Sequence, residues 1–239
     1  MVVSLIPKVR FRDALKALNA LFANPEDTAQ VFRVVEALSG GHSERMLARF
    51  RNAPAGRDLL RERPELIERL VDRTSLAKLP EGSLGRKYLE FLDSEGITAE
   101  GLKQASIAGR NAERHSSADE AFLKDRMRDT HDLWHVVTGY KGDLIGEASL
   151  LAFIFAQTRN PGIGFIVGAA LVRGNEPRVR GLIVRGFLRG ARAAWLPPVK
   201  WESLLALPVA EVRRQLRVGS PPEYVPFRAP AYLRTMAAA

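Results

Sequence analysis

Apolar residues recur at three- and four-residue spacing along nearly the whole chain, and this helical period constrains the fold more than any other feature. Alternating apolar and polar runs bounded by hairpin turns, the usual sign of strands, are missing from the sequence. The pattern therefore predicts an all-α helical bundle. No Pro/Gly/Ser-rich linker or charge block divides the chain, so we expect a single domain over residues 1–239.

Breaks in the period predict where the helices begin and end. Asn24-Pro25-Glu26-Asp27-Thr28 and Gly40-Gly41 interrupt it, and Ser83 and Thr98 are suited to cap the helices that follow them. Helices are expected over residues 11–22, 29–38, 43–50, 57–73 (one helix broken at Pro64, or two short ones), 87–92, 148–158, 164–172 and 177–195.

The composition excludes several kinds of site and partner. The chain has no cysteine, so disulfides, thiolate zinc sites, iron–sulfur clusters and cysteine nucleophiles are excluded. A net charge of +9 indicates an anionic partner, such as a membrane surface or a phosphate-bearing ligand. The basic residues are spread along the chain rather than gathered in a tail, so we expect no nucleic-acid partner.

The sequence also predicts that the chain neither carries a signal peptide nor crosses a membrane. Residues 1–7 are too short and too soon interrupted by Pro7 for a signal peptide. The longest apolar stretch, residues 148–172, is cut by the polar turn at 157–162 and predicts two apolar helices instead of a span.

The stretch from Asp129 to His135 carries the clearest chemical signal. On a helix, His131 and His135 lie about 40° apart on one face, with Asp132 beside them. Leu133, Trp134 and Val137 face the other way and are expected in the core. Two imidazoles and a carboxylate on one face predict ligands for a divalent metal.

A fourth ligand is expected on the next helix. Gly139 and Gly142 end the first helix, Asp143 is suited to cap the second, and Glu147 follows four residues after that cap. The sequence thus predicts a metal site between two successive helices, built from His131, Asp132, His135 and Glu147. Zinc, iron and manganese all suit this donor set, and the residues do not distinguish them.

Two other functions of the histidines, in a peptidase and in a phosphohydrolase, are disfavoured by the sequence. HDxxH differs from the HExxH of zinc peptidases, since Asp132 is one carbon shorter than the glutamate that serves there as general base, and a peptidase is disfavoured. A phosphohydrolase of the histidine–aspartate kind needs further distant His and Asp ligands, and no His follows His135. The remaining histidines, His42 and His115, lie in polar contexts and are expected to be solvated.

The motif His131-Asp132-x-x-His135, eleven residues and then Glu147 resembles the signature of the ubiquinone-biosynthesis family called Coq four. The resemblance covers about residues 24–218. It includes the Arg-x-Arg-acidic run at 126–129, two glycines at Gly139 and Gly146, and a Gln-Thr…Pro segment at 157–161. It also includes a Leu-Pro-x-Gly-Ser-Leu-Gly segment at 79–85 and the C-terminal Trp-Glu…Val-Arg helix at 201–213. Residues 151–154 depart from it, because Leu-Ala-Phe-Ile stands where members often have Lys-Trp-Phe-Glu.

This resemblance implies a role in coenzyme Q assembly. Family members are described as replacing the ring carboxyl of a prenylated hydroxybenzoate by a hydroxyl, an oxidative decarboxylation and hydroxylation. They are also described as organising other enzymes of the pathway. Two functions therefore stay open: a metal-dependent ring-modifying enzyme, and a non-catalytic lipid-binding scaffold with a structural metal. A polyprenylated quinone precursor and other quinone-biosynthesis enzymes are the implied partners, and a homodimer is allowed.

Three further expectations concern substrate and membrane. Arg126 and Arg128 are candidates to pair with a carboxylate beside the site. Residues 148–158 and 164–172 are candidates to line a groove for the prenyl tail. The segment 177–195 places Arg178, Arg185, Arg189 and Arg192 on one helical face, with Ile183, Val184, Phe187, Ala191 and Trp195 broadly opposite. Such a helix suits an anionic membrane surface, so we expect a cytoplasmic protein peripherally bound to the inner membrane.

Overall fold

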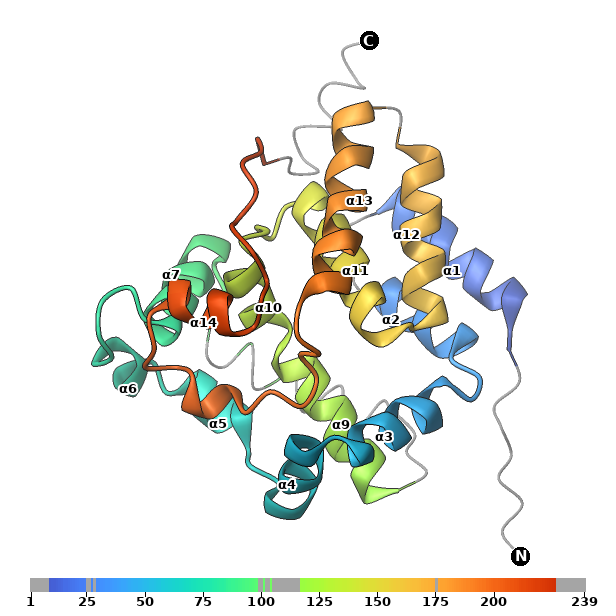
Figure 1. The fold of residues 1–239 in the computed structure, drawn as a ribbon. Coiled ribbons are helices and arrows are strands. Elements are labelled where there is room, and N and C mark those ends of the chain that lie inside the picture. The colour runs from blue at the N-terminus through green and yellow to red at the C-terminus, as the bar shows by residue number, and fades with distance from the viewer. Residues whose placement is uncertain are drawn as a thin grey trace, which may run out of the picture. The chain divides into compact units, whose positions relative to one another are not determined.

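The computed structural model describes residues 9–24, 27, 29–98, 101, 104, 117–174 and 176–226. Within these residues every regular element is a helix and no strand is formed, as the periodicity predicts (Figure 1). Contacts divide the chain into two compact units, each built from separated stretches. Unit 1 comprises Met1–Met46, Gly142–Arg192 and Glu223–Ala239, and unit 2 comprises Leu47–Lys141 and Ala193–Pro222. The single domain over residues 1–239 stays a prediction.

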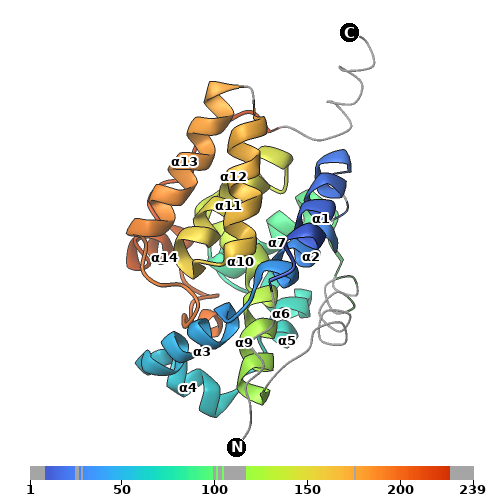
Figure 2. The same cartoon turned by 90° about the vertical axis from the view of Figure 1, so that its right-hand side faces the viewer.

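Unit 1 contains α1 (Phe11–Ala23), α2 (Ala29–Leu38), α11 (Leu144–Thr158), α12 (Pro161–Arg173) and α13 (Pro177–Arg192). These bounds agree closely with the expected helices. Figures 1 and 2 both show α11, α12 and α13 side by side. The core between α1, α2 and α12 is formed by small and branched side chains, namely Ala14, Ala17, Leu18, Val34, Ala37, Leu38 and Ile166.

Two glycines bring α13 into close contact with α11. A Cβ atom on Gly186 would lie 2.3 Å from the Ser149 carbonyl oxygen, and one on Gly190 would lie 2.5 Å from that of Phe153. Gly190 also accepts a hydrogen bond of 2.6 Å from Gln157 Nε2. The buried face of α13 is therefore set by Leu182, Ile183 and the two glycines.

This packing exposes part of the apolar side of α13. Val184 and Leu188 are 46% and 42% exposed. Trp195, which the sequence placed on the same helix, lies beyond its end in unit 2, where Arg49 stacks 4.0 Å from its ring centre. The helix thus presents an exposed strip of apolar side chains as well as its arginines.

The junction of α11 and α12 confirms the two apolar helices joined by a turn. Arg159 adopts a left-handed conformation (φ 58°), and the Asn160 side chain accepts hydrogen bonds from the Gly162 and Ile163 amides. Ala152, Val167 and Ile183 are buried together, so these helices supply core, and a prenyl groove along them stays a prediction. In the described part of the chain, no helix combines the length and apolarity needed to cross a membrane.

Unit 2 contains α4 (Pro54–Glu62), α5 (Leu66–Val71), α6 (Arg73–Ala77), α7 (Leu84–Glu95), α9 (Ala118–Asp129), α10 (His131–Thr138), the 3-10 turn η1 (Trp201–Ser203) and α14 (Val209–Gln215). The boundary between the units at Met46 and Leu47 falls within α3 (His42–Asn52). Of the two alternatives for residues 57–73, the one with separate helices is confirmed, and α6 was not expected. Ser83 and Thr98 act as predicted, accepting hydrogen bonds from the Arg86 and Gly101 amides.

The C-terminal part of unit 2 is tied to its earlier helices by buried polar contacts. The Leu84 and Gly85 amides donate to the Leu207 and Leu205 carbonyls, each at 2.8 Å. Arg126, whose side chain is 1% exposed, binds both carboxylate oxygens of Glu202 at 2.9 Å and the Val199 carbonyl at 2.8 Å. A buried guanidinium requires such partners, because an unpaired charge in the interior is strongly destabilising.

Replacing Glu202 by Ala should therefore destabilise the protein by about 3–5 kcal/mol, since Arg126 would stay buried without its carboxylate. Urea unfolding followed by circular dichroism measures the loss. Glu211→Ala, which removes the surface partner of Arg214, serves as the control and should leave the midpoint unchanged. A Glu202→Ala midpoint equal to that of the control would contradict the assigned role.

Candidate metal centre

The break between α9 and α10 places the first histidine at the start of a helix. α9 ends at Asp129, and Thr130, only 2% exposed, separates it from α10. At the other end, Gly139 has a φ of 77° and packs against Pro221, where a Cβ atom would lie 2.5 Å from that of the proline. Only glycine suits this position, so α10 has a fixed length of two turns.

The face of α10 predicted to bear the histidines is confirmed. Leu133, Trp134 and Val137 are at most 1% exposed, as expected of the core-facing side. The rings of His131 and His135 lie with centroids 4.9 Å apart and planes at 73°. The two imidazoles are therefore neighbours on one side of a short, fixed helix.

The His135 ring is held by two contacts. Its Nδ1 lies 2.9 Å from the carbonyl oxygen of Tyr140, and its plane stacks on Phe91 with centroids 5.1 Å apart and an angle of 18°. A carbonyl oxygen only accepts hydrogen bonds, so Nδ1 must carry the proton. In the neutral ring the lone pair then lies on Nε2, the state in which a histidine binds a metal.

His131 has a carboxylate in the corresponding place. Its Nδ1 lies 3.3 Å from Asp132 Oδ1, and its side chain is 37% exposed, far more open than His135. A carboxylate at Nδ1 again favours the tautomer with the lone pair on Nε2. The contact assigns Asp132 an orienting position beside His131. Whether Asp132 also binds a metal directly, as the sequence predicts, stays a prediction.

Buried aromatic and basic side chains complete the surroundings of α10 in unit 2. Arg213 donates to the carbonyls of Val137 and Val136, at 3.0 and 2.9 Å, and so satisfies the last turn of α10. Tyr88 on α7 is 1% exposed. Burial raises the pKa of the Tyr88 phenol far above its ordinary value, and the negative charges of Asp132 and Asp129 raise it further.

Glu147 belongs to unit 1, where a buried cap fixes its helix. Asp143, 1% exposed, accepts hydrogen bonds from the Ile145 and Gly146 amides and from the Tyr224 hydroxyl, the last at 2.7 Å. The Glu147 amide bonds the Asp143 carbonyl, which places Glu147 in the first turn of α11. Two imidazole nitrogens and a carboxylate are a donor set suited to a divalent cation. That His131, His135 and Glu147 bind one cation stays a prediction.

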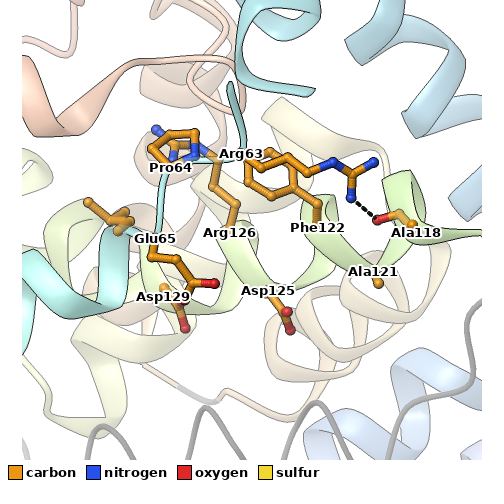
Figure 3. Close-up of a pocket in the computed structure, with 10 residues that line it drawn as sticks. Arg63, Pro64, Glu65, Ala118, Ala121, Phe122, Asp125, Arg126 and Asp129 are labelled. Carbon is orange, nitrogen blue, oxygen red and sulfur yellow. Dashed lines mark hydrogen bonds between the residues drawn. The ribbon is translucent and has the colours of Figure 1, made fainter. Parts of the chain in front are cut away.

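The two arginines expected beside the site pair with carboxylates of the chain itself. Arg126 is held by Glu202, as described above, and Arg128 pairs with Asp125. Arg126 and Asp125 also line a cavity of about 260 Å³ in unit 2, together with Phe122, Asp129 and residues at the start of α5 (Figure 3). A role of either arginine toward a substrate stays a prediction.

One expectation about the other histidines is wrong. His42 is 8% exposed and begins α3, so it is buried rather than solvated. Burial, and then the nearby charge of Arg45, lower its pKa, which keeps the ring neutral. Its polar sequence context gave no sign of this burial, which follows a turn at Gly40 and Gly41 in which Gly40 has a φ of 46°. His115 lies outside the described residues.

The shifted pKa of Tyr88 predicts a loss of stability in alkali. Above about pH 10 the unfolded chain can ionise this phenol while the folded chain cannot, so unfolding is favoured by up to about 1.4 kcal/mol per pH unit. Tyr88→Phe should remove this part of the decline. Unfolding curves of both proteins between pH 8 and about pH 11 test it, and parallel declines would contradict the assignment.

Comparison with known proteins agrees with the resemblance. Residues 7–222 match the Coq4 family, described as coenzyme Q (ubiquinone) biosynthesis protein Coq4. Curated relatives include mitochondrial ubiquinone biosynthesis proteins of Neurospora crassa and Aspergillus clavatus, 34% and 33% identical over 174 residues. These matches cover 71% of this chain but only 48% and 58% of the relatives, so the chain spans about half the length of the curated relatives it matches.

A solved structure supports the same conclusion. The crystal structure of a protein from Nostoc punctiforme, described as a ubiquinone biosynthesis protein, superposes with a TM-score of 0.62 at 27% identity. It covers 89% of this chain and all of its own. Because the family match extends over residues 7–222, the chain belongs to the Coq4 family of ubiquinone biosynthesis proteins.

Proposed function

We propose that the chain is a metal-dependent enzyme of ubiquinone biosynthesis, with His131, His135 and Glu147 as ligands of one divalent cation. The main support for the proposal is the hydrogen bond from His135 Nδ1 to the Tyr140 carbonyl. This bond leaves the lone pair of the buried imidazole on Nε2, where it can bind a cation. Asp132 orients His131 in the same way from the more exposed side. Family membership supplies the pathway, and the chemistry of these donors supplies the metal.

The proposed reaction replaces the ring carboxyl of a prenylated hydroxybenzoate by a hydroxyl. The carbon–carbon bond to the carboxyl breaks and releases CO₂, and a carbon–oxygen bond forms at the same ring position. This is a two-electron oxidation, for which dioxygen is the proposed oxidant: it accepts two electrons and two protons to become hydrogen peroxide, while water supplies the hydroxyl oxygen. A divalent cation bound at the site would supply positive charge for the carboxylate and the adjacent phenolate oxygen.

The residues of the chain have two tasks in this proposal. His131 lies on the more exposed side, so the substrate carboxylate approaches past it, while buried His135 holds the innermost position. Tyr88 is a neutral phenol at physiological pH, as an ordinary tyrosine is, and its raised pKa extends this neutral state further into alkali. A site kept free of further anions is suited to binding an anionic aromatic acid.

Metal content and pathway function should therefore be lost together. We expect His135→Gln to abolish stoichiometric metal, measured by elemental analysis of protein purified without chelator, and to fail to rescue cells blocked at this ring step. Asp132→Asn keeps the size but removes the charge that orients His131, so it should weaken metal binding. His42→Gln, which alters a buried histidine of α3, is the control and should retain metal and rescue.

The outcomes separate the enzyme from the scaffold. Full rescue by a His135→Gln protein that has lost its metal would contradict the enzyme and favour a non-catalytic lipid-binding organiser of other pathway enzymes. Conversion of a carboxylated prenylphenol to the hydroxylated product by the purified protein is the direct test of the proposed reaction. Metal retained by His135→Gln would contradict the ligand assignment.

We further propose that α13 binds an anionic membrane surface, where a prenylated substrate resides. Its exposed apolar residues Val184 and Leu188 are bordered along the helix by Arg180 on one side and by Arg185 and Arg192 on the other. No acidic residue lies within the helix. An apolar strip edged by arginines suits the interface between headgroups and acyl chains.

Binding to vesicles that contain phosphatidylserine should be salt-sensitive and should weaken in Arg185→Gln/Arg192→Gln, since each cation near such a surface contributes about 1 kcal/mol. Leu188→Asn should weaken binding without changing its salt dependence. Arg57→Gln/Arg69→Gln removes the same charge from exposed positions of unit 2 and is the control. Sedimentation that is equal for neutral and anionic vesicles would contradict the proposal.

A further inference from the structure

The structure assigns Phe91 as a positioning residue for the metal ligand His135, an inference that rests on the proposed metal site. Phe91 is a half-buried ring on α7, and no sequence signal marked it. Its plane lies nearly parallel to the His135 imidazole, at 18°, with centroids 5.1 Å apart. The contact is direct, between the phenylalanine and a ring proposed to bind the cation.

Two contacts together leave the His135 ring a single orientation. The hydrogen bond from Nδ1 to the Tyr140 carbonyl fixes one point of the ring but allows rotation about the line of that bond. Phe91 lies against the face of the ring and blocks that rotation. His131 approaches edge-on at 4.9 Å. The direction of the Nε2 lone pair is thus set by a carbonyl and an aromatic face acting together.

The stack also favours the charge that the imidazole carries in the bound state. An aromatic ring is negative on its face, so it attracts a neighbouring group that is positively polarised. A histidine becomes more positive when Nε2 donates to a cation. Phe91 therefore stabilises the metal-bound ring more than the free one, and its removal should weaken affinity as well as order.

The helix that bears Phe91 is firmly placed in unit 2. The α7 helix begins at the Ser83 cap and ends at Gly96, which has a φ of 68°. Its first amides, of Leu84 and Gly85, bond to the segment at 205–207. Tyr88, one turn before Phe91, is 1% exposed and anchors the same face. The backbone that carries Phe91 is therefore held in place, which keeps the phenyl ring against the His135 imidazole.

The test measures zinc affinity of the full chain by competition with a chromophoric chelator. Phe91→Leu keeps an apolar side chain but removes the aromatic face, and we expect affinity to fall about three- to tenfold, the usual worth of one aromatic pair. Phe91→Tyr restores the face and should restore affinity. Phe122→Leu, a half-buried phenylalanine of the same unit whose ring lies 6.0 Å from the Arg63 guanidinium, is the matched control and should bind as the wild type does.

A second readout is independent of the metal. In the apo protein, the Hε1 resonance of His135 should be shifted upfield by the Phe91 ring, and the shift should vanish in Phe91→Leu and persist in Phe91→Tyr. Equal zinc affinity of wild type and Phe91→Leu would overturn the inference alone. A wild type that binds no zinc, iron or manganese would overturn the proposed metal site, and the positioning role with it.

Discussion

The fold of the histidine-bearing half depends on the burial of one short helix. Residues 133–138 of α10 are all buried, so the carbonyl groups at its end cannot turn to water. Arg213 supplies hydrogen bonds to two of them, and the left-handed Gly139 turns the chain so that the Tyr140 carbonyl faces His135. The same requirement that stabilises the helix end thus selects the tautomer of the imidazole. One set of hydrogen bonds therefore both completes the end of α10 and fixes which nitrogen of His135 carries the proton.

Much of the fold can be predicted from short-range signals in the sequence. Helical period, caps and glycines were enough to predict the all-α class, the bounds of α2 to the residue and the shared face of His131 and His135, because each follows from residues within one or two turns. Phe91, Tyr88 and the partners of Arg126 lie 41 to 76 residues away from the residues with which they interact, and no local pattern marks them. The buried face of α13 could be predicted only in part, because two glycines, as well as the apolar Leu182 and Ile183, lie on it.

Three of the segments that resemble the family, at 79–85, 126–129 and 201–213, contact one another or α10 in unit 2. The segment at 79–85 pairs with 205–209, the arginine before the histidine motif binds Glu202, and Arg213 closes α10. Each joins a stretch close to the motif with the C-terminal stretch. What looks in the sequence like several weak resemblances is therefore one connected support for the helix that carries the two histidines.

These long connections also order the events of synthesis. A chain leaves the ribosome from its N-terminus at about 5–20 residues per second, and early segments begin to fold before later ones exist. The carbonyls of Val136 and Val137 must wait for Arg213, made 76 residues later than Val137. Until then the carbonyls of Val136 and Val137 lack the guanidinium that binds them in the folded chain. The end of the helix that carries the two histidines is consequently completed late in translation.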